Sequence, residues 1–358
     1  MRRLAFLALT LATGCSDALE QKSSAGQVIG VVNANDRTLS VISATDFSVS
    51  THDWQSGTAS PRTIDGRGHV FVVPLGAADA VGISRFFTCP PGALALGVPP
   101  DYVLPLAPGS GATGAAIQDD SIAWIANPNL NTVTRVNYLR NGDTTSIAVG
   151  VYPQAVAIVG TRVFVVNSNL VGATPAGPSW LTSFECCATS PTPDSIALTG
   201  ANARFAVVGD DSLLYVIASG HAGAADGKLS IVDPQARAEV AVLNGLGESP
   251  GAAAFHPAGS RLLVASATEG ILEVNASIRV ITRGPGNGVK PGGHGVSGLA
   301  IDLRGRVYAV DAASLATPEF CAVSGGVVHV LTAPPDYHEI HTATVGCGPT
   351  TAAVAATP

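Results

Sequence analysis

Short apolar segments that end in a small or polar residue recur seven times along the chain. Their central residues are spaced by 41, 53, 40, 51, 48 and 45 positions, and these residues are Val31, Val72, Ile125, Val165, Val216, Val264 and Ala309. A repeat of this length is typical of four-stranded sheets arranged radially around an axis. The pattern therefore predicts an all-β fold, a seven-bladed propeller of four-stranded antiparallel blades.

Each repeat contains further segments with their own side-chain pattern. Alternating apolar and polar residues, as in 38–44 and 132–138, predict third strands with one buried face. Outer strands such as 194–200 and 338–346 end in glycine, which permits a turn into the next blade. Small residues introduced by Pro or Gly predict innermost strands, where the axis is crowded; these segments are 61–64, 114–117, 153–157, 203–208, 250–255 and 297–301.

The two ends of the chain complete one another. The first repeated strand, which begins near Gln27, has no inner strand before it. The final segment, 348–358, has the inner-strand pattern but no repeated strand after it. We therefore expect the C-terminal strand to complete blade one, which closes the ring and removes a free sheet edge. The propeller is expected to occupy residues 27–358.

Two segments resemble known propeller repeats. SPGAAAFHPAGSRLLVASA (249–267) and VSGLAIDLRGRVYAVDA (296–312) are similar to the YVTN-type and NHL-type repeats, in which a Pro- or Gly-led inner strand is followed by a Gly-containing turn and a YVTN-like or VYVAD-like strand. The resemblance departs at blade two, where Pro74 occupies the polar strand end. It implies the propeller fold but no activity, since these families bind different ligands through different loop residues.

The N-terminus has the pattern of an export signal. Two arginines precede an apolar run, 4–12, that is too short to span a bilayer. The string ATGC at 12–15 resembles a bacterial lipobox, in which the cysteine is lipidated, although Ala12 stands where Leu or Val is usual. We expect a signal peptide over 1–14, then a lipidated Cys15 within a flexible tether, 15–26. Ser16 after the cysteine favours the outer membrane.

Composition and charge limit the kinds of partner that the chain is expected to bind. Charged residues make up 13% of the chain, and the net charge is −7. Only three lysines are present, so no basic stripe is available for a nucleic-acid backbone and nucleic-acid binding is not expected. Membrane attachment is expected through the N-terminal lipid only, and no cofactor is expected.

Cysteine usage is consistent with export. Besides Cys15, five cysteines remain, at 89, 186, 187, 321 and 347, and this odd number leaves at least one thiol unpaired or bonded to another chain. Adjacent Cys186 and Cys187 could form a vicinal disulfide, or one of them could reach Cys89, and the sequence does not choose. We expect Cys321 and Cys347 to be paired, because both should lie on one face beside the ring closure.

Long insertions between second and third strands predict the face that binds a ligand. They are 168–180, 219–227 and 312–325, and they emerge on the same face of a rigid ring. We expect a ligand to lie against Trp180, His221 and His294, not near His69 or His256 on the opposite face. The segment His338 to His341 is expected to be a solvated outer strand, because residues three apart point to opposite faces.

A metal site is not expected. The candidates at the inner-strand entrances are Asn202 and Glu248. The remaining acidic residues near the inner strands are explained by turn formation in hairpins; they are Asp65, Asp210, Asp211 and Asp302.

These features favour an exported, lipid-anchored binding or scaffold module at the bacterial cell envelope, with a protein, glycan or small molecule as its partner. The alternative is a metal-dependent lactonase or hydrolase, because the gluconolactonase-like enzymes resemble this chain in fold. Such a site needs several oxygen ligands that converge on the axis. The sequence contains no G-x-S-x-G elbow and no phosphate-binding loop between a strand and a helix. Catalytic activity is therefore the second hypothesis.

Overall fold

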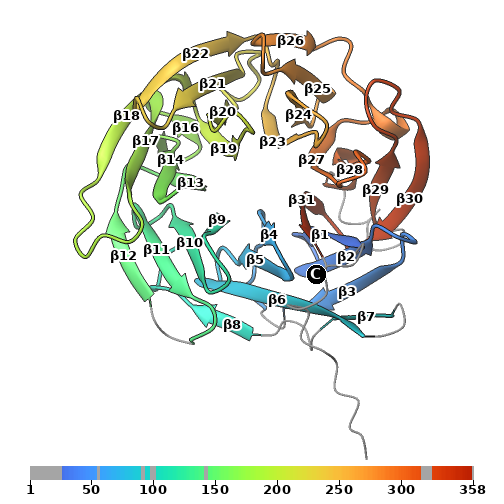
Figure 1. The fold of residues 1–358 in the computed structure, drawn as a ribbon, viewed down its shortest axis with the longest axis horizontal. Helices are drawn as coiled ribbons and strands as arrows, with labels where there is room; N and C mark the ends of the chain where they lie inside the picture. Colours follow the sequence, from blue (N-terminus) through green and yellow to red (C-terminus); the bar gives the residue numbers. More distant parts are fainter. Residues whose placement is uncertain are drawn as a thin grey trace, which may run out of the picture.

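The protein forms a ring of seven antiparallel blades around a central axis (Figure 1). The computed structural model describes residues 26–54, 57–89, 93–96, 102–140, 144–315 and 325–356. The expected signal peptide, Cys15 and Cys321 lie outside these residues. Within them, no helix is long and apolar enough to cross a membrane.

Blades one to three take up the first part of the chain. Blade one contains β31 (Pro349–Ala356), β1 (Gln27–Asn33), β2 (Thr38–Ser43) and β3 (Val49–Asp53), from the axis outward. Blade two contains β4 (Asp65–Arg67), β5 (Val70–Pro74) and β6 (Ala80–Cys89), with both β7 (Ala93–Leu96) and β8 (Tyr102–Pro105) paired to β6. Blade three contains β9 (Gly114–Ile117), β10 (Ile122–Asn127), β11 (Thr132–Asn137) and β12 (Thr144–Ala148).

Blades four to seven repeat the same order. Blade four contains β13 (Pro153–Val159), β14 (Arg162–Asn167), β17 (Pro178–Glu185) and β18 (Asp194–Ala201), and its insertion forms a ribbon of β15 (Leu170–Val171) and β16 (Thr174–Pro175). Blade five contains β19 (Ala203–Val208), β20 (Leu214–Ala218), β21 (Lys228–Asp233) and β22 (Ala238–Asn244). Blade six contains β23 (Pro250–Phe255), β24 (Arg261–Ser266), β25 (Gly270–Asn275) and β26 (Val280–Arg283). Blade seven contains β27 (Val296–Ile301), β28 (Val307–Asp311), β29 (Gly326–Leu331) and β30 (Glu339–Val345), with short 3-10 turns η2 (Pro291–Gly293) and η3 (Ala312–Leu315) beside it.

The seven repeated segments are the second strands of the seven blades, as predicted. The central residue of each is fully buried. One neighbouring blade covers each face of these strands. Both faces are therefore buried, which explains why the strands are continuous apolar runs and do not alternate between apolar and polar residues. One boundary differs from the expectation. The inner strand of blade two begins at Asp65, and segment 61–64 leads into it without joining the strand ladder.

The ring is closed by the C-terminal strand, which confirms the expected closure. β31 pairs antiparallel with β1 from Gln27 opposite Ala356 to Asn33 opposite Pro349. The two ends of the chain therefore form the inner half of one blade, and β1 has a neighbour on both edges.

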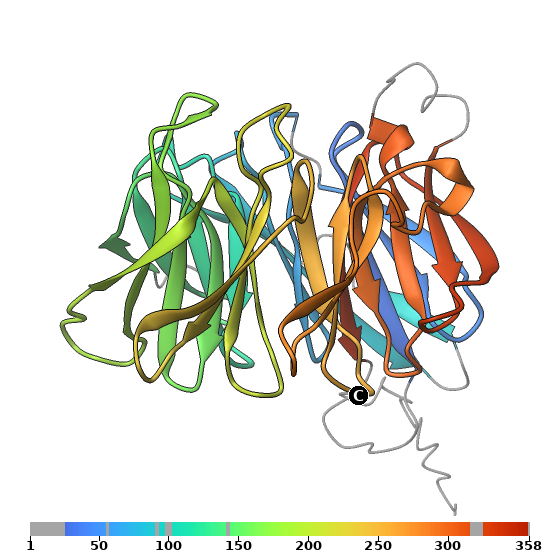
Figure 2. The same ribbon diagram turned by 90° about the horizontal axis from the view of Figure 1, so that it is seen from above.

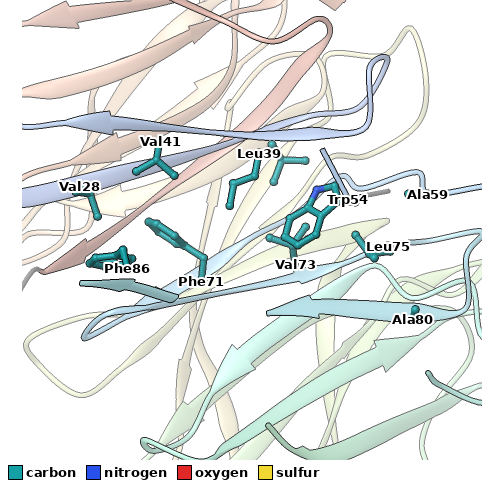
Figure 3. Close-up of a cluster of buried hydrophobic side chains, with 12 residues drawn as sticks. Val28, Leu39, Val41, Trp54, Ala59, Phe71, Val73, Leu75, Ala80 and Phe86 are labelled. Atoms are coloured by element: carbon teal, nitrogen blue, oxygen red, sulfur yellow. The ribbon is translucent and has the colours of Figure 1, made fainter. Parts of the chain in front are cut away.

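The hydrophobic core is divided among the junctions between blades. The described residues form seven clusters, and each cluster combines side chains from two adjacent blades. Between blades one and two, Trp54 and Phe71 fill the space between β2 and β5 (Figure 3). Phe71 also packs against Phe86 with ring centroids 5.4 Å apart. Because no blade has a core of its own, every blade depends on both neighbours.

Removal of β31 tests this dependence. We expect deletion of residues 349–356 to lower the free energy of unfolding by several kcal/mol, because it uncovers Ile29 and Val31 on β1, and each buried side chain of this size contributes about 1.5–3 kcal/mol. Thermal unfolding measures the loss. A synthetic peptide of residues 348–356, added to the truncated protein, should restore part of it. An unchanged melting temperature on deletion would contradict the closure.

Candidate ligand-binding site at the channel mouth

Two adjoining cavities occupy the centre of the ring. The cavity at the mouth, where the inner strands begin, has a volume of about 290 Å³. The deeper one has a volume of about 270 Å³ and is lined by the inner strands of blades two to five. Both cavities are lined by Thr63, Gln154, Arg204 and Phe205, so they form one channel. In the side view, loops project from both faces of the ring (Figure 2).

Equivalent positions of the seven inner strands form a ring around the mouth. Five are the second residues of their inner strands, whereas Thr113 directly precedes β9 and Arg62 lies in the segment that leads into β4. All seven line the cavity there: Arg62, Thr113, Gln154, Arg204, Gly251, Ser297 and Thr350. We call these residues the mouth ring. The expectation from the sequence did not include them. Aligning the starts of the predicted inner strands would have found them, because polar residues stand there among alanines and glycines.

A repeated backbone irregularity directs the mouth ring toward the axis. The strand register shifts at Gln154, Arg204, Ser297 and Thr350, so each has no partner on the second strand. Such a bulge leaves one residue unpaired and redirects its side chain. In five blades the residue two positions earlier has a positive φ; these residues are Gly111, Tyr152, Asn202, Ser249 and Gly348. The ring geometry is therefore built into the backbone.

Hydroxyl groups connect the blades at the mouth. Thr350 Oγ1 donates to the Arg62 carbonyl at 3.1 Å, Thr113 Oγ1 to the Pro153 carbonyl at 3.4 Å, and Ser297 Oγ to the Pro349 carbonyl at 3.2 Å. Further hydroxyls bridge the neighbouring junctions: Thr63 Oγ1 to Thr113, Ser168 Oγ to Ala203, and Ser219 Oγ to Pro250. In this way, six of the seven blade junctions carry a hydroxyl-to-carbonyl bond that fixes the width of the mouth.

Three polar side chains of the mouth ring remain available. Arg62, Gln154 and Arg204 have no side-chain hydrogen bond or ion pair among the described residues. Both arginines are exposed to the channel. The surrounding walls reduce the hydration of the Arg204 guanidinium, and this loss of hydration lowers the pKa of Arg204. The positive charge of Arg62 lowers it further. The mouth therefore carries two cations that line one cavity and have no carboxylate partner in the described part of the chain.

Asp65 lies deeper in the channel and joins blades two and three. Its carboxylate accepts the backbone N–H of Ile117 at 2.7 Å and that of Gly66 at 3.0 Å. Burial nevertheless raises the pKa of Asp65 to about 6, against the opposing effect of these hydrogen bonds and of Arg67. The expectation that Asp65 belongs to a hairpin turn accounts for the Gly66 bond but not for the bond between blades.

The three residues expected to contact a ligand lie at separate places on the mouth face. The indole of Trp180 covers Gly150, where a Cβ would be 2.5 Å from ring atoms. His221 pairs within its own loop, with Nδ1 2.7 Å from Asp226 Oδ2. His294 pairs with Asp311 at 3.0 Å. None of the three lines the two channel cavities, and a ligand against them stays a prediction.

His294 is the outer end of a chain of titratable groups across blade seven. Asp311 Oδ2 lies 3.0 Å from His294 Nδ1 and 3.5 Å from His329 Nε2. His329 Nδ1 lies 3.0 Å from Glu339 Oε2. Asp311 and His329 are buried, whereas the side chain of His294 is 52% exposed. A carboxylate that orients an accessible imidazole is suited to proton transfer, and the same bonds also connect three strands and the loop before β27.

Asn202 and Glu248, the candidate metal ligands, take part in hydrogen bonds that involve main-chain carbonyl groups. Asn202 has φ of 54° and donates from Nδ2 to the Gly220 carbonyl at 3.1 Å. Asn tolerates this conformation better than most residues. The carbonyl of Glu248 accepts from Ser266 Oγ at 3.2 Å. In the part of the chain that the structure describes, no group of three or more His, Cys, Asp or Glu side chains could hold a metal ion.

The adjacent cysteines are free thiols. Their sulfur atoms lie 2.7 Å apart, Cys186 is buried and Cys187 is exposed. Burial, followed by the hydrogen bond with Cys187, raises the pKa of Cys186 to about 12. Cys347 is disulfide-bonded. Its expected partner Cys321 lies outside the described residues, so that pairing stays a prediction.

Comparison with known proteins supports the fold alone. No protein-family model matches the sequence, and no curated protein matches it. Three similar solved structures are a functionally unknown protein from Desulfotomaculum acetoxidans (TM-score 0.63, 12% identity, 92% of this chain and 98% of that one), apo AztD from Citrobacter koseri (0.60, 12%, 93% and 99%) and virginiamycin B lyase from Staphylococcus aureus (0.57, 12%, 81% and 93%). At this identity the likeness shows a seven-bladed propeller, and the resemblance to YVTN-type and NHL-type repeats stays a prediction.

The raised pKa of Asp65 predicts a pH dependence of stability. A carboxyl with a folded pKa near 6 and an unfolded pKa of 3.8 stabilises the fold below about pH 4, and this contribution is lost as the pH rises through 6. Asp65→Asn keeps one oxygen that accepts the Ile117 N–H, loses the acceptor of the Gly66 N–H, and does not ionise. We expect the stability of wild type relative to the variant to fall by about 1–3 kcal/mol between pH 4 and pH 8. Urea denaturation at both pH values measures this change, which cancels the effect of the lost Gly66 bond. A stability difference that is the same at both pH values, or that shifts in favour of wild type at pH 8, would contradict the raised pKa.

Proposed function

We propose that this protein is an exported, lipid-anchored binding module of the bacterial cell envelope and that it takes a small ligand at the channel mouth. The observation that carries this proposal is the mouth ring, in which one residue at or just before the start of each inner strand lines a cavity of about 290 Å³. A concave site with a few convergent polar groups and apolar walls is the usual form of a small-molecule site.

The distribution of free polar groups supports binding over a purely structural role. The hydroxyls of Thr113, Ser297 and Thr350 are used in bonds between blades. The longer side chains of Arg62, Gln154 and Arg204 are not used in this way among the described residues. Donors left free on a rigid ring can bind a ligand without reorganisation of the backbone, which reduces the entropy lost on binding.

Gly251 offers a direct test of the site. A Cβ added there meets nothing closer than the carbonyl oxygens of Ala265 and Ser297, each 3.9 Å away. Gly251→Trp should therefore fold and fill the mouth. Gly57→Trp is the matched control, because Gly57 has nothing within 4 Å and lies outside the channel.

A panel of sugars, amino acids, carboxylic acids and phosphate esters is screened by ligand-induced change in melting temperature. We expect at least one compound to stabilise wild type and Gly57→Trp by several degrees, as linkage predicts for ligand far above its dissociation constant. The same compound should not stabilise Gly251→Trp. Equal stabilisation of all three proteins would place binding elsewhere and contradict the proposal.

The lipid anchor is tested separately. We expect the wild-type protein to fractionate with membranes after a salt wash, because multiple acyl chains anchor a protein stably. Cys15→Ala should move the protein to the soluble fraction, as measured by immunoblot. Ser16→Ala is the control and should remain with membranes. Membrane retention of Cys15→Ala would contradict lipid anchoring.

The alternative, a metal-dependent lactonase or hydrolase, remains the second hypothesis. Loading purified protein with calcium or zinc and assaying a lactone panel for proton release distinguishes it from a binding module.

A further inference from the structure

We propose that the channel mouth binds a small organic anion, whose carboxylate or phosphate group is held between Arg62 and Arg204. This inference rests on the proposed function and names the ligand class of that site. It is carried by two guanidinium groups that line one cavity from opposite parts of the ring and have no acidic partner among the described residues.

Arg62 and Arg204 share one cavity without an acidic partner among the described residues, whereas several arginines elsewhere pair with carboxylates. Arg162 contacts Glu185 at 2.8 Å and Asp194 at 2.7 Å, and Arg306 contacts Asp302 at 2.6 Å. The chain has a net charge of −7, so carboxylates are plentiful. Two cations that share one cavity without an acidic partner repel each other in the free protein, and a bound anion would offset this repulsion.

Because both arginines lie on the mouth ring, they can contact the same ligand in the cavity. Arg62 belongs to blade two and Arg204 to blade five, and Gln154 of blade four lies between them on the mouth ring. A guanidinium presents a planar fork of donors that matches a carboxylate or a phosphate. The amide of Gln154 supplies a further donor. Three donor groups that line one cavity suit an oxyanion, and the two guanidinium charges disfavour a cation there.

The rest of the cavity indicates an organic body attached to the anionic group. The wall on blades five to seven is formed largely by apolar side chains, among them Phe205, Pro250, Ala252, Ala265 and Val296. The polar donors come from blades two to five. A ligand with an acidic group at one end and a short apolar body at the other fits both walls, and a volume of about 290 Å³ limits it to a small molecule.

Arg62→Gln, Arg204→Gln and the double variant test the proposal. The matched control is Arg304→Gln, which makes the same charge change at an exposed arginine of the β27–β28 turn, on the opposite face. Binding is measured by calorimetry and thermal shift with inorganic phosphate, succinate and hexanoate as probes. Sodium chloride at equal ionic strength controls for screening.

We expect at least one probe to bind wild type and Arg304→Gln, with about tenfold weaker binding to each single variant and about a hundredfold weaker binding to the double variant. Hexanoate or succinate binding without phosphate binding identifies a carboxylate, and the reverse identifies a phosphate. Arg204→Lys should retain an intermediate affinity because it keeps the charge but loses the fork. The probe-free melting temperature of Arg204→Gln should equal or exceed that of wild type, since no partner is lost.

Three results would overturn the inference. They are the absence of binding of all three probes to wild type, unchanged binding to the double variant, or a large fall in the probe-free melting temperature of Arg204→Gln, which would indicate a structural arginine. If a neutral compound binds wild type and fails to bind Gly251→Trp under these conditions, the anion clamp is wrong and the proposed function stands. If anions require the arginines but also bind Gly251→Trp, the clamp is right and the part of the mouth beside Gly251 takes no part in binding.

Discussion

The close approach of neighbouring inner strands around the axis is the constraint on which the rest of the structure depends. A Cβ on Gly114 would lie 2.3 Å from the Gln154 carbonyl of the next blade, and a Cβ on Gly298 would lie 2.5 Å from the Cα of Thr351. Backbones at this separation leave room for hydroxyl-to-carbonyl bonds between blades, and these bonds are present at six of the seven junctions. The width of the channel is thus fixed by backbone contact, and the mouth ring is positioned with it.

The strain at the mouth is offset by the core between the blades. Tyr152, Asn202 and Ser249 adopt positive φ where the chain turns into an inner strand, and such conformations cost about 1–3 kcal/mol each. The clusters between blades bury large side chains such as Trp124, Phe164 and Tyr215. Burial of one such group contributes enough to offset one strained turn. Because each cluster is shared by two blades, the turns are held from both sides, which suits a rigid binding surface.

The sequence predicts the ring much better than it predicts the site. Second strands are buried on both faces, so their apolar runs are visible without an alignment, and the unpaired segment 348–358 indicates the closure. The mouth ring depends on register shifts at residues such as Gln154 and Arg204, and a shift of one residue leaves no mark in the hydrophobic pattern. The long loops attract attention as candidate sites instead. In one of them His221 already has a partner, Asp226.

Ion pairs within the blades contrast with the two unpaired arginines at the channel mouth. In blade seven, His329 lies 3.5 Å from Asp311 and 3.0 Å from Glu339, and in blade six Arg283 pairs with buried Glu273 at 3.0 Å. These groups satisfy the rule that buried charge is compensated. Arg62 and Arg204 are exposed to the channel and have no acidic partner among the described residues, in a protein of net negative charge. Arg204 stands at one of the register shifts that recur near the starts of the inner strands. Unpaired charges at a cavity are expected where binding determines the residues, and this is the basis of the proposed anion site.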